Sequence, residues 1–348
     1  MMFNMADNEV QINLPLVTVL IPVYNGEKYV QTALKSILNQ TYKNLEVLII
    51  NDGSTDGSHQ IIVSTEDERI RYVHNKKNLK LITTLNLGFD LAKGKYIARM
   101  DADDIAEPER IAKQLEFMES NPEIGISGTW FKTIGNRNSI GKYPADHNSI
   151  KYTALYQCPF LHPSVMIRTS VLRNHRFYYD SEYPHAEDFE LWGRMAEVTK
   201  MANIPEVLMN YRHHESNISA LENPTQRKNS SLIKQSFYAQ MGVTATENDM
   251  DLFEKMNHQV RTLSTDELNR LGKMLTSCVV GNRKGKYLYP GWFDQTIAAK
   301  WLETCSNHTY YGWFIWQTYW KFSGLRVKPL SVKSTVKFLI KVLLRKKQ

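Results

Sequence analysis

Three carboxylates lie close together in the stretch Asp101-Ala102-Asp103-Asp104, directly after the short apolar run 96–100. Carboxylates at this spacing repel one another, and a bound cation removes that repulsion. Oxygen ligands select Mg²⁺ or Mn²⁺, and Mg²⁺ is commonly held by one or two carboxylates together with substrate phosphates. The alternative is a solvated acidic loop before the helix that begins near Pro108. The neighbouring segments decide between these two interpretations.

The first hundred residues alternate between strand-length and helix-length apolar patterns. Four buried strands are expected from short apolar runs at 16–22, 45–50, 70–73 and 96–100. The segments between these runs have helical spacing, which predicts a mostly parallel α/β sheet with helices on both faces. Beyond it, the patterns predict a helix at 108–118 and strands at 124–130, 165–167 and 207–211.

A polar cluster follows three of these strands at the point where each ends: Tyr24-Asn25, Asn51-Asp52 and Asp101–Asp104. The carboxyl ends of parallel strands meet at one edge of a sheet, and ligands bind there. A polar, acid-lined edge predicts a nucleotide-type ligand held through a metal. No G-x-G-x-x-G follows the first strand, so the dinucleotide-binding fingerprint is absent.

The charge is distributed unevenly. The net charge is +7, but nine basic and no acidic residues follow Glu303, so residues 1–320 carry −2 without them. A nucleic-acid-binding domain carries its own basic face, and we therefore expect no nucleic acid partner. The three cysteines, Cys158, Cys278 and Cys305, have no paired or metal-type spacing. With no signal peptide and no apolar stretch long enough to span a bilayer, this pattern predicts a cytoplasmic protein.

The basic tail at residues 331–348 has a helical pattern. Lys333, Lys337, Lys341 and Arg345 recur at every fourth position, which makes one basic stripe on a helix. The opposite side carries Val332, Val336, Leu339 and Leu343. This pattern predicts a helix that lies on the anionic inner face of the plasma membrane. The alternative is a helix that packs its apolar side on the protein and leaves its charges in water.

Between about Pro15 and Ser219, the chain resembles the inverting, nucleotide-sugar-dependent glycosyltransferases of family 2, which have the GT-A fold. The matching motifs are V-T-V-L-I-P-V-Y-N-G at 17–26, N-D-G-S-T-D at 51–56, D-A-D-D-I at 101–105, H-P-S-V-M-I-R at 162–168, A-E-D-F-E-L-W at 186–192 and Y-R-H-H-E-S-N-I-S at 211–219. The resemblance implies a Rossmann-like, mixed but mostly parallel sheet flanked by helices. We expect an N-terminal tail at 1–14, a catalytic domain at 15–220, a helical extension at 221–330 and the basic tail at 331–348.

The same resemblance implies a role for each matching residue. The nucleotide pocket would be lined by Pro22, Tyr24, Asn25 and Glu27, with Asp52 bound to the base. Asp101 would contact the ribose, or the metal through water, and Asp103 would ligate the metal. His214 would contact the diphosphate or the metal, and the catalytic base would be Asp188. For Asp188 the alternative is a helix N-cap, and for His214 it is a surface histidine.

The family's pattern N-x-G-x-x-x-A-R-N-x-G is only partly kept. In the stretch 78–88, Lys80 stands in place of the glycine and Leu85 in place of the arginine. The contacts of this segment with the donor are therefore in doubt, although a lysine there could reach a phosphate.

The expected activity is metal-dependent transfer of a hexosyl or N-acetylhexosaminyl group from a UDP-sugar to a hydroxyl of a glycan or lipid-linked acceptor. A bacterial surface polysaccharide is the expected product class. Two alternatives stay open: a nucleotidyltransferase-like enzyme, and a non-catalytic, membrane-associated nucleotide-binding protein. A nucleotidyltransferase needs a basic loop after the first strand, where this chain has Tyr24-Asn25.

Overall fold

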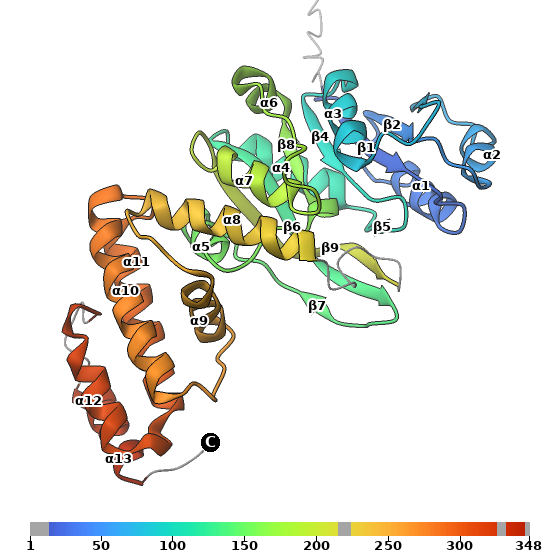
Figure 1. Ribbon diagram of the computed structural model, residues 1–348. Helices are drawn as coiled ribbons and strands as arrows, with labels where there is room; N and C mark the ends of the chain where they lie inside the picture. Colours follow the sequence, from blue (N-terminus) through green and yellow to red (C-terminus); the bar gives the residue numbers. More distant parts are fainter. Residues whose placement is uncertain (1–13, 215–223, 326–331, 345–348) are drawn as a thin grey trace, which may run out of the picture. The chain divides into compact units, whose positions relative to one another are not determined.

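The computed structural model describes residues 14–214, 224–325 and 332–344 (Figure 1). The last part of the 211–219 motif, the first 13 residues and the basic residues Arg345, Lys346 and Lys347 lie outside the described residues. The chain divides into two compact units. The sheet unit comprises residues 1–142, 160–181 and 199–220, and the helical unit comprises residues 143–159, 182–198 and 221–348. The expected domain at 15–220 thus contains two short segments that group with the helices.

The sheet unit is built on one mixed sheet. Its strands are β1 (Val17–Val23), β2 (Leu45–Asn51), β3 (Ile70–His74), β4 (Tyr96–Arg99), β5 (Ile105–Ala106), β6 (Ile124–Gly135), β7 (Ile140–Gly141), β8 (Met166–Arg168) and β9 (Lys200–His213). They lie in the order β3-β2-β1-β4-β8-β6-β9-β5, with β7 beside β6. The pairs among β1, β2, β3 and β4 are parallel, whereas β8 runs antiparallel to β4 and β6. The predicted fold class is confirmed.

The helices of the sheet unit follow the strands closely: α1 (Val30–Leu38), α2 (Ser58–Val63), α3 (Leu81–Leu91), α4 (Arg110–Ser120), η1 (His162–Ser164) and α6 (Thr169–His175). The chain crosses from β1 to β2 and from β2 to β3 in one direction, and returns from β3 to β4 in the other. Right-handed crossovers therefore place α1 and α2 on one face of the sheet and α3 on the other. A Cβ atom on Gly88 of α3 would lie 2.4 Å from a methyl group of Leu20, so this helix needs glycine to pack on β1.

The core of the sheet is formed by apolar strands that are buried on both faces. All seven residues of β1 and all seven of β2 are buried. One charged group is held among them: Glu46 of β2 accepts hydrogen bonds from Thr18 Oγ1 at 2.6 Å and from the backbone N–H of Lys93 at 2.9 Å. This carboxylate joins the amino-terminal ends of β1 and β2 to the loop before β4.

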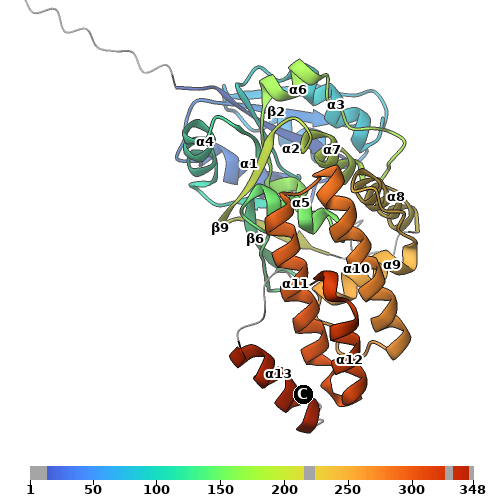
Figure 2. The ribbon, with the colours of Figure 1, turned by 90° about the vertical axis from the view of Figure 1, so that its left-hand side faces the viewer.

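The helical unit contains α5 (His147–Ala154), α7 (Glu187–Met195), α8 (Pro224–Gln240), α9 (Glu247–Asn257), α10 (Thr265–Gly285), α11 (Pro290–Asn307), η3 (Thr309–Tyr311), α12 (Trp313–Lys321), η4 (Ser323–Leu325) and α13 (Val332–Leu344). Figure 2 shows α10 and α11 as long neighbouring helices, with α12 beside them. Their core is largely aromatic and aliphatic, with Phe253, Phe293 and Trp301 fully buried. Capping boxes begin α9 at Thr246 and α10 at Ser264, because each side chain accepts the orphan N–H three residues on.

Among the described residues, none of the helices is both long and apolar enough to cross a lipid bilayer.

Candidate functional site

The acidic cluster lies where β4 ends, at the carboxyl edge of the parallel strands. β4 ends at Arg99, and Asp101, Asp103 and Asp104 follow in the loop before β5. Each of the three carboxylates offers an oxygen within 4.8 Å of the others. This confirms that the three side chains converge, as their spacing predicts.

Asp101 is paired with Arg99, a residue that the sequence reasoning missed. The Arg99 guanidinium is buried and makes a two-point contact with the carboxylate, through Nη1 at 2.7 Å and Nη2 at 2.5 Å. Burial alone would lower the pKa of Arg99, but Asp101, Tyr179 and Asp104 together outweigh it and raise the pKa. The two-point contact holds Asp101 in one orientation. The feature of the sequence that could have indicated this role is that Arg99 is a single charged residue inside an apolar strand.

Asp104 is fully buried at the base of the cluster. Its Oδ1 accepts the backbone N–H of Arg212 at 2.8 Å, while its Oδ2 has no hydrogen-bond partner among the described residues. Burial, together with the carboxylates of Asp101 and Asp103, holds the pKa of Asp104 well above that of an ordinary aspartate. A cation among these groups would lower that pKa and satisfy the orphan oxygen.

Asp103 is joined to the end of β9, more than 100 residues away in the sequence. His214 Nε2 and Asp103 Oδ2 lie 2.8 Å apart, and Arg212 Nε donates to the Asp103 carbonyl at 2.8 Å. The His214 ring stacks on Tyr29, with 5.6 Å between centroids, and Tyr29 also lies under the Arg212 guanidinium. The sheet therefore brings Asp101, Asp103 and His214 into one place; Tyr29 and Arg212 are neighbours that the sequence reasoning did not single out.

His162, in the motif at 162–168, is a half-buried group beside this edge. Its Nε2 lies 2.8 Å from the Tyr179 hydroxyl. Burial and the nearby Arg99 guanidinium lower the pKa of His162 well below its usual value, so the ring is neutral at pH 7. The motif drew attention to the segment, but nothing local in the sequence indicated that the ring faces Tyr179.

Two of the predicted nucleotide-pocket residues join the loops after β1 and β2. Asn25 Oδ1 accepts the N–H of Thr55 at 2.9 Å, and Glu27 Oε2 accepts that of Gly57 at 2.6 Å. Asn25 itself has a φ of 50°, a left-handed conformation that asparagine tolerates. These bonds explain why an amide and a carboxylate are found at these positions, since each receives N–H groups of the neighbouring loop.

The other predicted nucleotide-pocket residues differ in exposure. Pro22 is buried within β1, whereas Tyr24 is 52% exposed. Asp52 is 4% exposed, and its Oδ1 accepts the side-chain amide of Asn75 at 2.9 Å and the N–H of Leu79 at 2.8 Å. The second carboxylate oxygen of Asp52 makes no hydrogen bond with the described residues. Asp52 thus fixes the loop before α3 with one of its two carboxylate oxygens.

Lys80 keeps the backbone conformation of the glycine that it replaces. Its φ of 74° and ψ of 158° lie in a region that is almost restricted to glycine. The side chain is exposed, and the residue directly precedes α3. The substitution therefore adds a cation without changing the course of the chain, and the backbone carries the strain.

Asp188 belongs to the helical unit, in the first turn of α7. It is half-buried; its Oδ1 accepts the N–H of Phe189 at 2.8 Å, and its Oδ2 lies 3.8 Å from Cys158 Sγ. The position that caps α7 is Ala186, so Asp188 is not the N-cap residue. The alternative role that the sequence left open for Asp188, that of a helix N-cap, is therefore excluded.

The residues of the acidic cluster fit a divalent cation. The donors are carboxylate oxygens and one imidazole, a set that suits Mg²⁺ or Mn²⁺ better than a thiophilic metal. The buried Oδ2 of Asp104 also indicates a missing positive partner.

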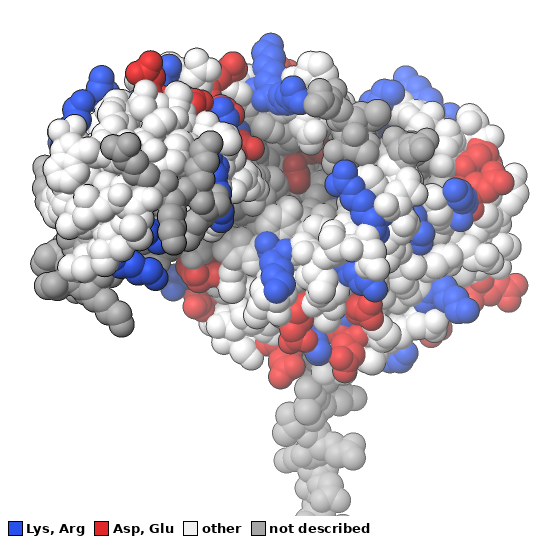
Figure 3. Space-filling model, turned by 90° about the horizontal axis from the view of Figure 1, so that it is seen from below, with Lys and Arg blue, Asp and Glu red and all other residues white. Residues whose placement is uncertain are grey.

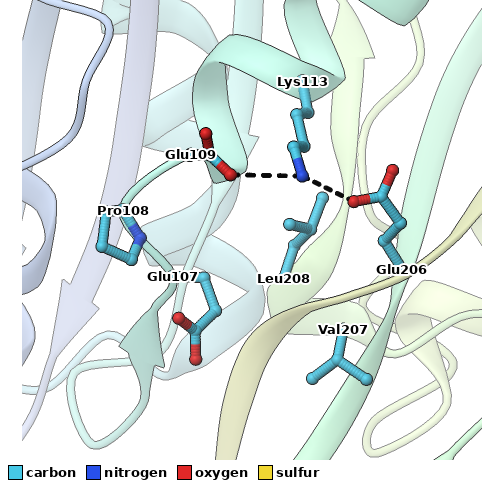
Figure 4. Close-up of a pocket in the computed structure, with 7 residues that line it drawn as sticks. All are labelled: Glu107, Pro108, Glu109, Lys113, Glu206, Val207 and Leu208. Atoms are coloured by element: carbon cyan, nitrogen blue, oxygen red, sulfur yellow. Dashed lines mark hydrogen bonds and ion pairs between the residues drawn. The ribbon is translucent and has the colours of Figure 1, made fainter.

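A separate hollow of about 490 Å³ lies at the β5 edge of the sheet (Figure 4). It is lined by Glu107, Pro108, Glu109, Lys113, Glu206, Val207 and Leu208. Lys113 reaches Glu109 at 3.2 Å and Glu206 at 2.6 Å, so these carboxylates already have a cationic partner. None of the lining residues belongs to the acidic cluster, and we do not assign the donor to this hollow.

Known proteins resemble this chain in sequence. A family model described as glycosyl transferase family 2 matches residues 18–180. An uncharacterized glycosyltransferase of Haemophilus influenzae is 35% identical over 278 residues, which are 76% of this chain and 84% of the relative. The putative glycosyltransferase EpsE of Bacillus subtilis is 34% identical over 192 residues, 53% of this chain and 67% of the relative.

Solved structures share the fold. Residues 1–349 of S. aureus TarS, crystallised with UDP, superpose with a TM-score of 0.54 at 17% identity, covering 85% of this chain and 90% of that one. The same fragment with UDP-GlcNAc gives a TM-score of 0.55 at 16% identity, covering 88% and 89%. At this identity the likeness concerns the fold, and it extends through the helical part of the chain as well as the sheet.

Proposed function

Because the chain belongs to glycosyl transferase family 2, we propose that it transfers a sugar from a UDP-sugar to an acceptor hydroxyl with inversion at the anomeric carbon. The acceptor is a glycan or a lipid-linked saccharide, and the product a polysaccharide or related glycan. The observation that carries the proposal is the convergence of Asp101, Asp103 and Asp104 at the carboxyl edge of a parallel sheet. UDP is favoured as the donor nucleotide because TarS, which shares the fold, binds UDP and UDP-GlcNAc.

The nucleotide lies at the ends of β1 and β2 in this proposal. The free oxygen of Asp52 accepts an N–H of the base, and the exposed ring of Tyr24 covers the base or ribose. Pro22, Asn25 and Glu27 shape this pocket from below, since their own atoms are buried in β1 or bound to the neighbouring loop. Lys80 extends from the start of α3 towards the diphosphate.

Mg²⁺ or Mn²⁺ would be held by Asp103 with Asp101 and His214, and it would supply positive charge to neutralise the departing diphosphate. The protein's own groups prepare this site. Arg99 orients Asp101 through an ion pair, and the bond between Asp104 and the Arg212 N–H fixes the end of β9, from which His214 reaches Asp103.

In the reaction, Asp188 accepts the proton of the acceptor hydroxyl while its oxygen attacks the anomeric carbon. The bond between that carbon and the diphosphate oxygen breaks, and UDP leaves with the electron pair. A single displacement inverts the centre and needs one base only, unlike retaining hydrolysis with two carboxylates. The half-buried position of Asp188 in the first turn of α7, without the N-cap role, supports this assignment.

Two substitutions test the proposal by separating binding from chemistry. Asp103→Asn should abolish the dependence of UDP affinity on Mn²⁺, measured by calorimetry, and with it transfer. Asp188→Asn should leave UDP affinity unchanged and lower transfer by about 10² or more, because only proton removal is lost. Matched controls are Glu109→Gln for the first and Glu190→Gln for the second, which neighbour each residue without belonging to the site.

The products also decide between reaction types. Transfer to a hydroxyl releases UDP, whereas attack on the α-phosphorus, as in a nucleotidyltransferase, releases other phosphates. Release of a sugar phosphate, with the uridylyl group transferred to the acceptor, would overturn the proposal, as would unchanged transfer in Asp188→Asn. UDP binding without turnover on a panel of UDP-sugars and saccharide acceptors would instead identify a binding protein.

A further inference from the structure

Helix α13 exposes an apolar face to solvent. Phe338 and Val342 are both 2% exposed, whereas Val336, Ile340, Leu343 and Leu344 are 47%, 49%, 66% and 58% exposed. Phe338 packs on Trp316 and Tyr319 of α12, with 5.6 and 5.3 Å between ring centroids. The sequence predicted one apolar side, and the structure divides it between two faces. We call Val336, Ile340, Leu343 and Leu344 the outer face of α13.

The helix is therefore already docked without the outer face. Two aromatic contacts and the burial of Val342 hold it against α12. The outer face consists of four large apolar side chains at positions i, i+4, i+7 and i+8, which form a continuous stripe along the helix. This stripe is not needed to hold α13 against α12. Such a stripe costs free energy in water unless another surface covers it.

The charge beside the outer face indicates what covers it. Lys337 is exposed and Lys341 half-exposed, and on the helix both lie along one side of the apolar stripe. After Glu303 the chain has nine basic residues and no acidic one. Figure 3 shows the molecule from below; on the left of the view most described residues are white, with Lys and Arg as well as Asp and Glu side chains at the margins. A second copy of the chain seated on this face would bring the same positive charges together, whereas an anionic lipid surface attracts them.

The dimensions and the aromatic residues agree with a bilayer surface. The 13 residues of α13 span about 20 Å, too short to cross a bilayer but suited to lie in its headgroup region. Trp313 of α12 is 55% exposed, and tryptophan is favoured at the boundary between headgroups and acyl chains. We propose that the outer face of α13 inserts into the surface of an anionic lipid bilayer, with Lys337 and Lys341 contacting the headgroups.

This proposal goes beyond glycosyl transfer and is tested without activity. The full chain is sedimented with vesicles of phosphatidylcholine alone, or of phosphatidylcholine mixed with phosphatidylglycerol. We expect binding to the anionic vesicles that weakens as salt shortens the screening length from about 10 Å at 0.1 M to about 3 Å at 1 M. Failure to sediment with the anionic vesicles at low salt would overturn the proposal.

Matched variants locate the contact. The triple variant Val336→Ser, Ile340→Ser, Leu343→Ser should weaken vesicle binding at least about tenfold through lost apolar burial. The control Leu232→Ser, Val280→Ser removes two similarly exposed apolar side chains from α8 and α10, at 45% and 49% exposure, and should change nothing. Thermal melts of all variants should agree with the wild type, since the outer face supports no packing. Equal binding by the triple variant and the wild type would overturn the proposal.

Charge variants and a fluorescent probe complete the test. Lys337→Gln and Lys341→Gln should each lower binding to the anionic vesicles about fivefold, whereas Lys273→Gln and Lys284→Gln on α10 should not. An environment-sensitive dye on Ile340→Cys should shift to the blue with anionic vesicles, and the same dye on Val280→Cys should not. A blue shift of the dye at both positions would exclude insertion of the outer face. Insertion would also be excluded if the triple variant lost a concentration-dependent self-association of the wild type but still bound vesicles.

Discussion

In the sheet unit, the side chains of Asp104 and Arg110 have no exposed surface, and Arg99 is 3% exposed. In the described part of the helical unit, the most buried carboxylate, Lys or Arg is Glu187, at 5%. The polar groups buried deepest among the helices are neutral and complete backbone hydrogen bonds. Asn282 bonds the N–H and carbonyl of Leu288, and His308 lies between the Leu263 N–H and the Thr304 carbonyl.

This difference separates polar groups that stabilise the fold from polar groups kept for a ligand. A neutral side chain with two backbone partners costs little to bury. A buried charge costs several kcal/mol of folding free energy unless it is fully paired. Apolar residues of similar volume often stabilise the fold more than a buried ion pair does. Among the helices Asp294 Oδ1 is also unbonded, but Asp294 is paired with Arg283, whereas the unbonded Oδ2 of Asp104 lies beside two further carboxylates. This arrangement fits the proposed cation site, whose positive partner comes from outside the chain.

The largest effect is expected from breaking the buried charge network of the sheet unit. Arg110 is fully buried; its Nη2 donates to the Arg99 carbonyl at 2.7 Å and its Nε to Gln114 at 3.0 Å. Arg110→Ala should cost about 3–5 kcal/mol in the free energy of unfolding, because it empties a buried site and removes both hydrogen bonds. Asn282→Ala in the helical unit should cost only about 1–3 kcal/mol, since two neutral bonds are lost.

Urea denaturation followed by circular dichroism measures both changes. Arg110→Met, which keeps much of the volume, should fall between Arg110→Ala and the wild type if packing also matters. An Arg110→Ala variant that loses less free energy than Asn282→Ala would contradict the distinction between the two units.

A smaller effect is expected from pH, through one histidine in each unit: His162, which is half-buried, and His308, which is buried. Burial lowers the pKa of His162, helped by Arg99, and burial likewise lowers the pKa of His308, both from an ordinary value of 6.5. Below pH 6.5 the unfolded chain takes up protons that the folded rings do not. Stability is thus complete above pH 6.5 and is lost as the pH falls, by at most about 1.4 kcal/mol per pH unit for each ring.

Replacement of each ring separates the two contributions. His162→Gln should flatten the pH dependence over a wider range than His308→Gln, because the pKa of His162 is lowered further. Each variant is compared with the wild type by thermal melts between pH 5 and pH 8. If both variants keep the pH dependence of stability of the wild type, the rings take up protons in the folded protein as they do in the unfolded chain.

The parts of this structure that were predictable are those encoded locally. β1 to β4 follow from short apolar runs, and Asp101–Asp104 from carboxylates at the end of one of them. β9 was expected only from Val207, but it begins at Lys200. Pro205 and Glu206 interrupt the apolar pattern, and the strand tolerates them because the register with β6 shifts between Ile204 and Val207.

The parts that were not predictable depend on contacts distant in the sequence. Arg99 looks like an irregularity in an apolar strand until its pairing with Asp101 is seen. The contact of Asp103 with His214 was expected through the family resemblance alone, since no local pattern links residues 111 positions apart. The grouping of 143–159 and 182–198 with the C-terminal helices is likewise a property of packing, which depends on contacts distant in the sequence.

The smallest effect, about 1 kcal/mol, is expected at Lys80, where it should be a gain in stability. Lys80 occupies a conformation with φ of 74° and ψ of 158°, which costs a residue other than glycine about 1–3 kcal/mol. Lys80→Gly removes this strain and adds about 0.5–1 kcal/mol of chain entropy to the unfolded state. Lys286 in the helical unit, with φ of 53° and ψ of 31°, is the matched control, because it ends α10 in an ordinary left-handed conformation.

Both glycine variants should melt at a higher temperature than the wild type, but only Lys80→Gly should bind UDP more weakly, by about tenfold if one charge-assisted hydrogen bond to the diphosphate is lost. Lys80→Ala separates the two effects, since it removes the cation and keeps the strain: its UDP affinity should match that of Lys80→Gly, without the gain in stability. A loss of stability in Lys80→Gly would show that the backbone is unstrained there. Unchanged UDP affinity in both Lys80 variants would mean that the lysine has no contact with the nucleotide. A gain in stability together with a loss of affinity would identify Lys80 as a residue that strengthens binding and destabilises the fold. Asp104 and Arg110 differ in the same way from the neutral polar groups of the helices, which stabilise the fold.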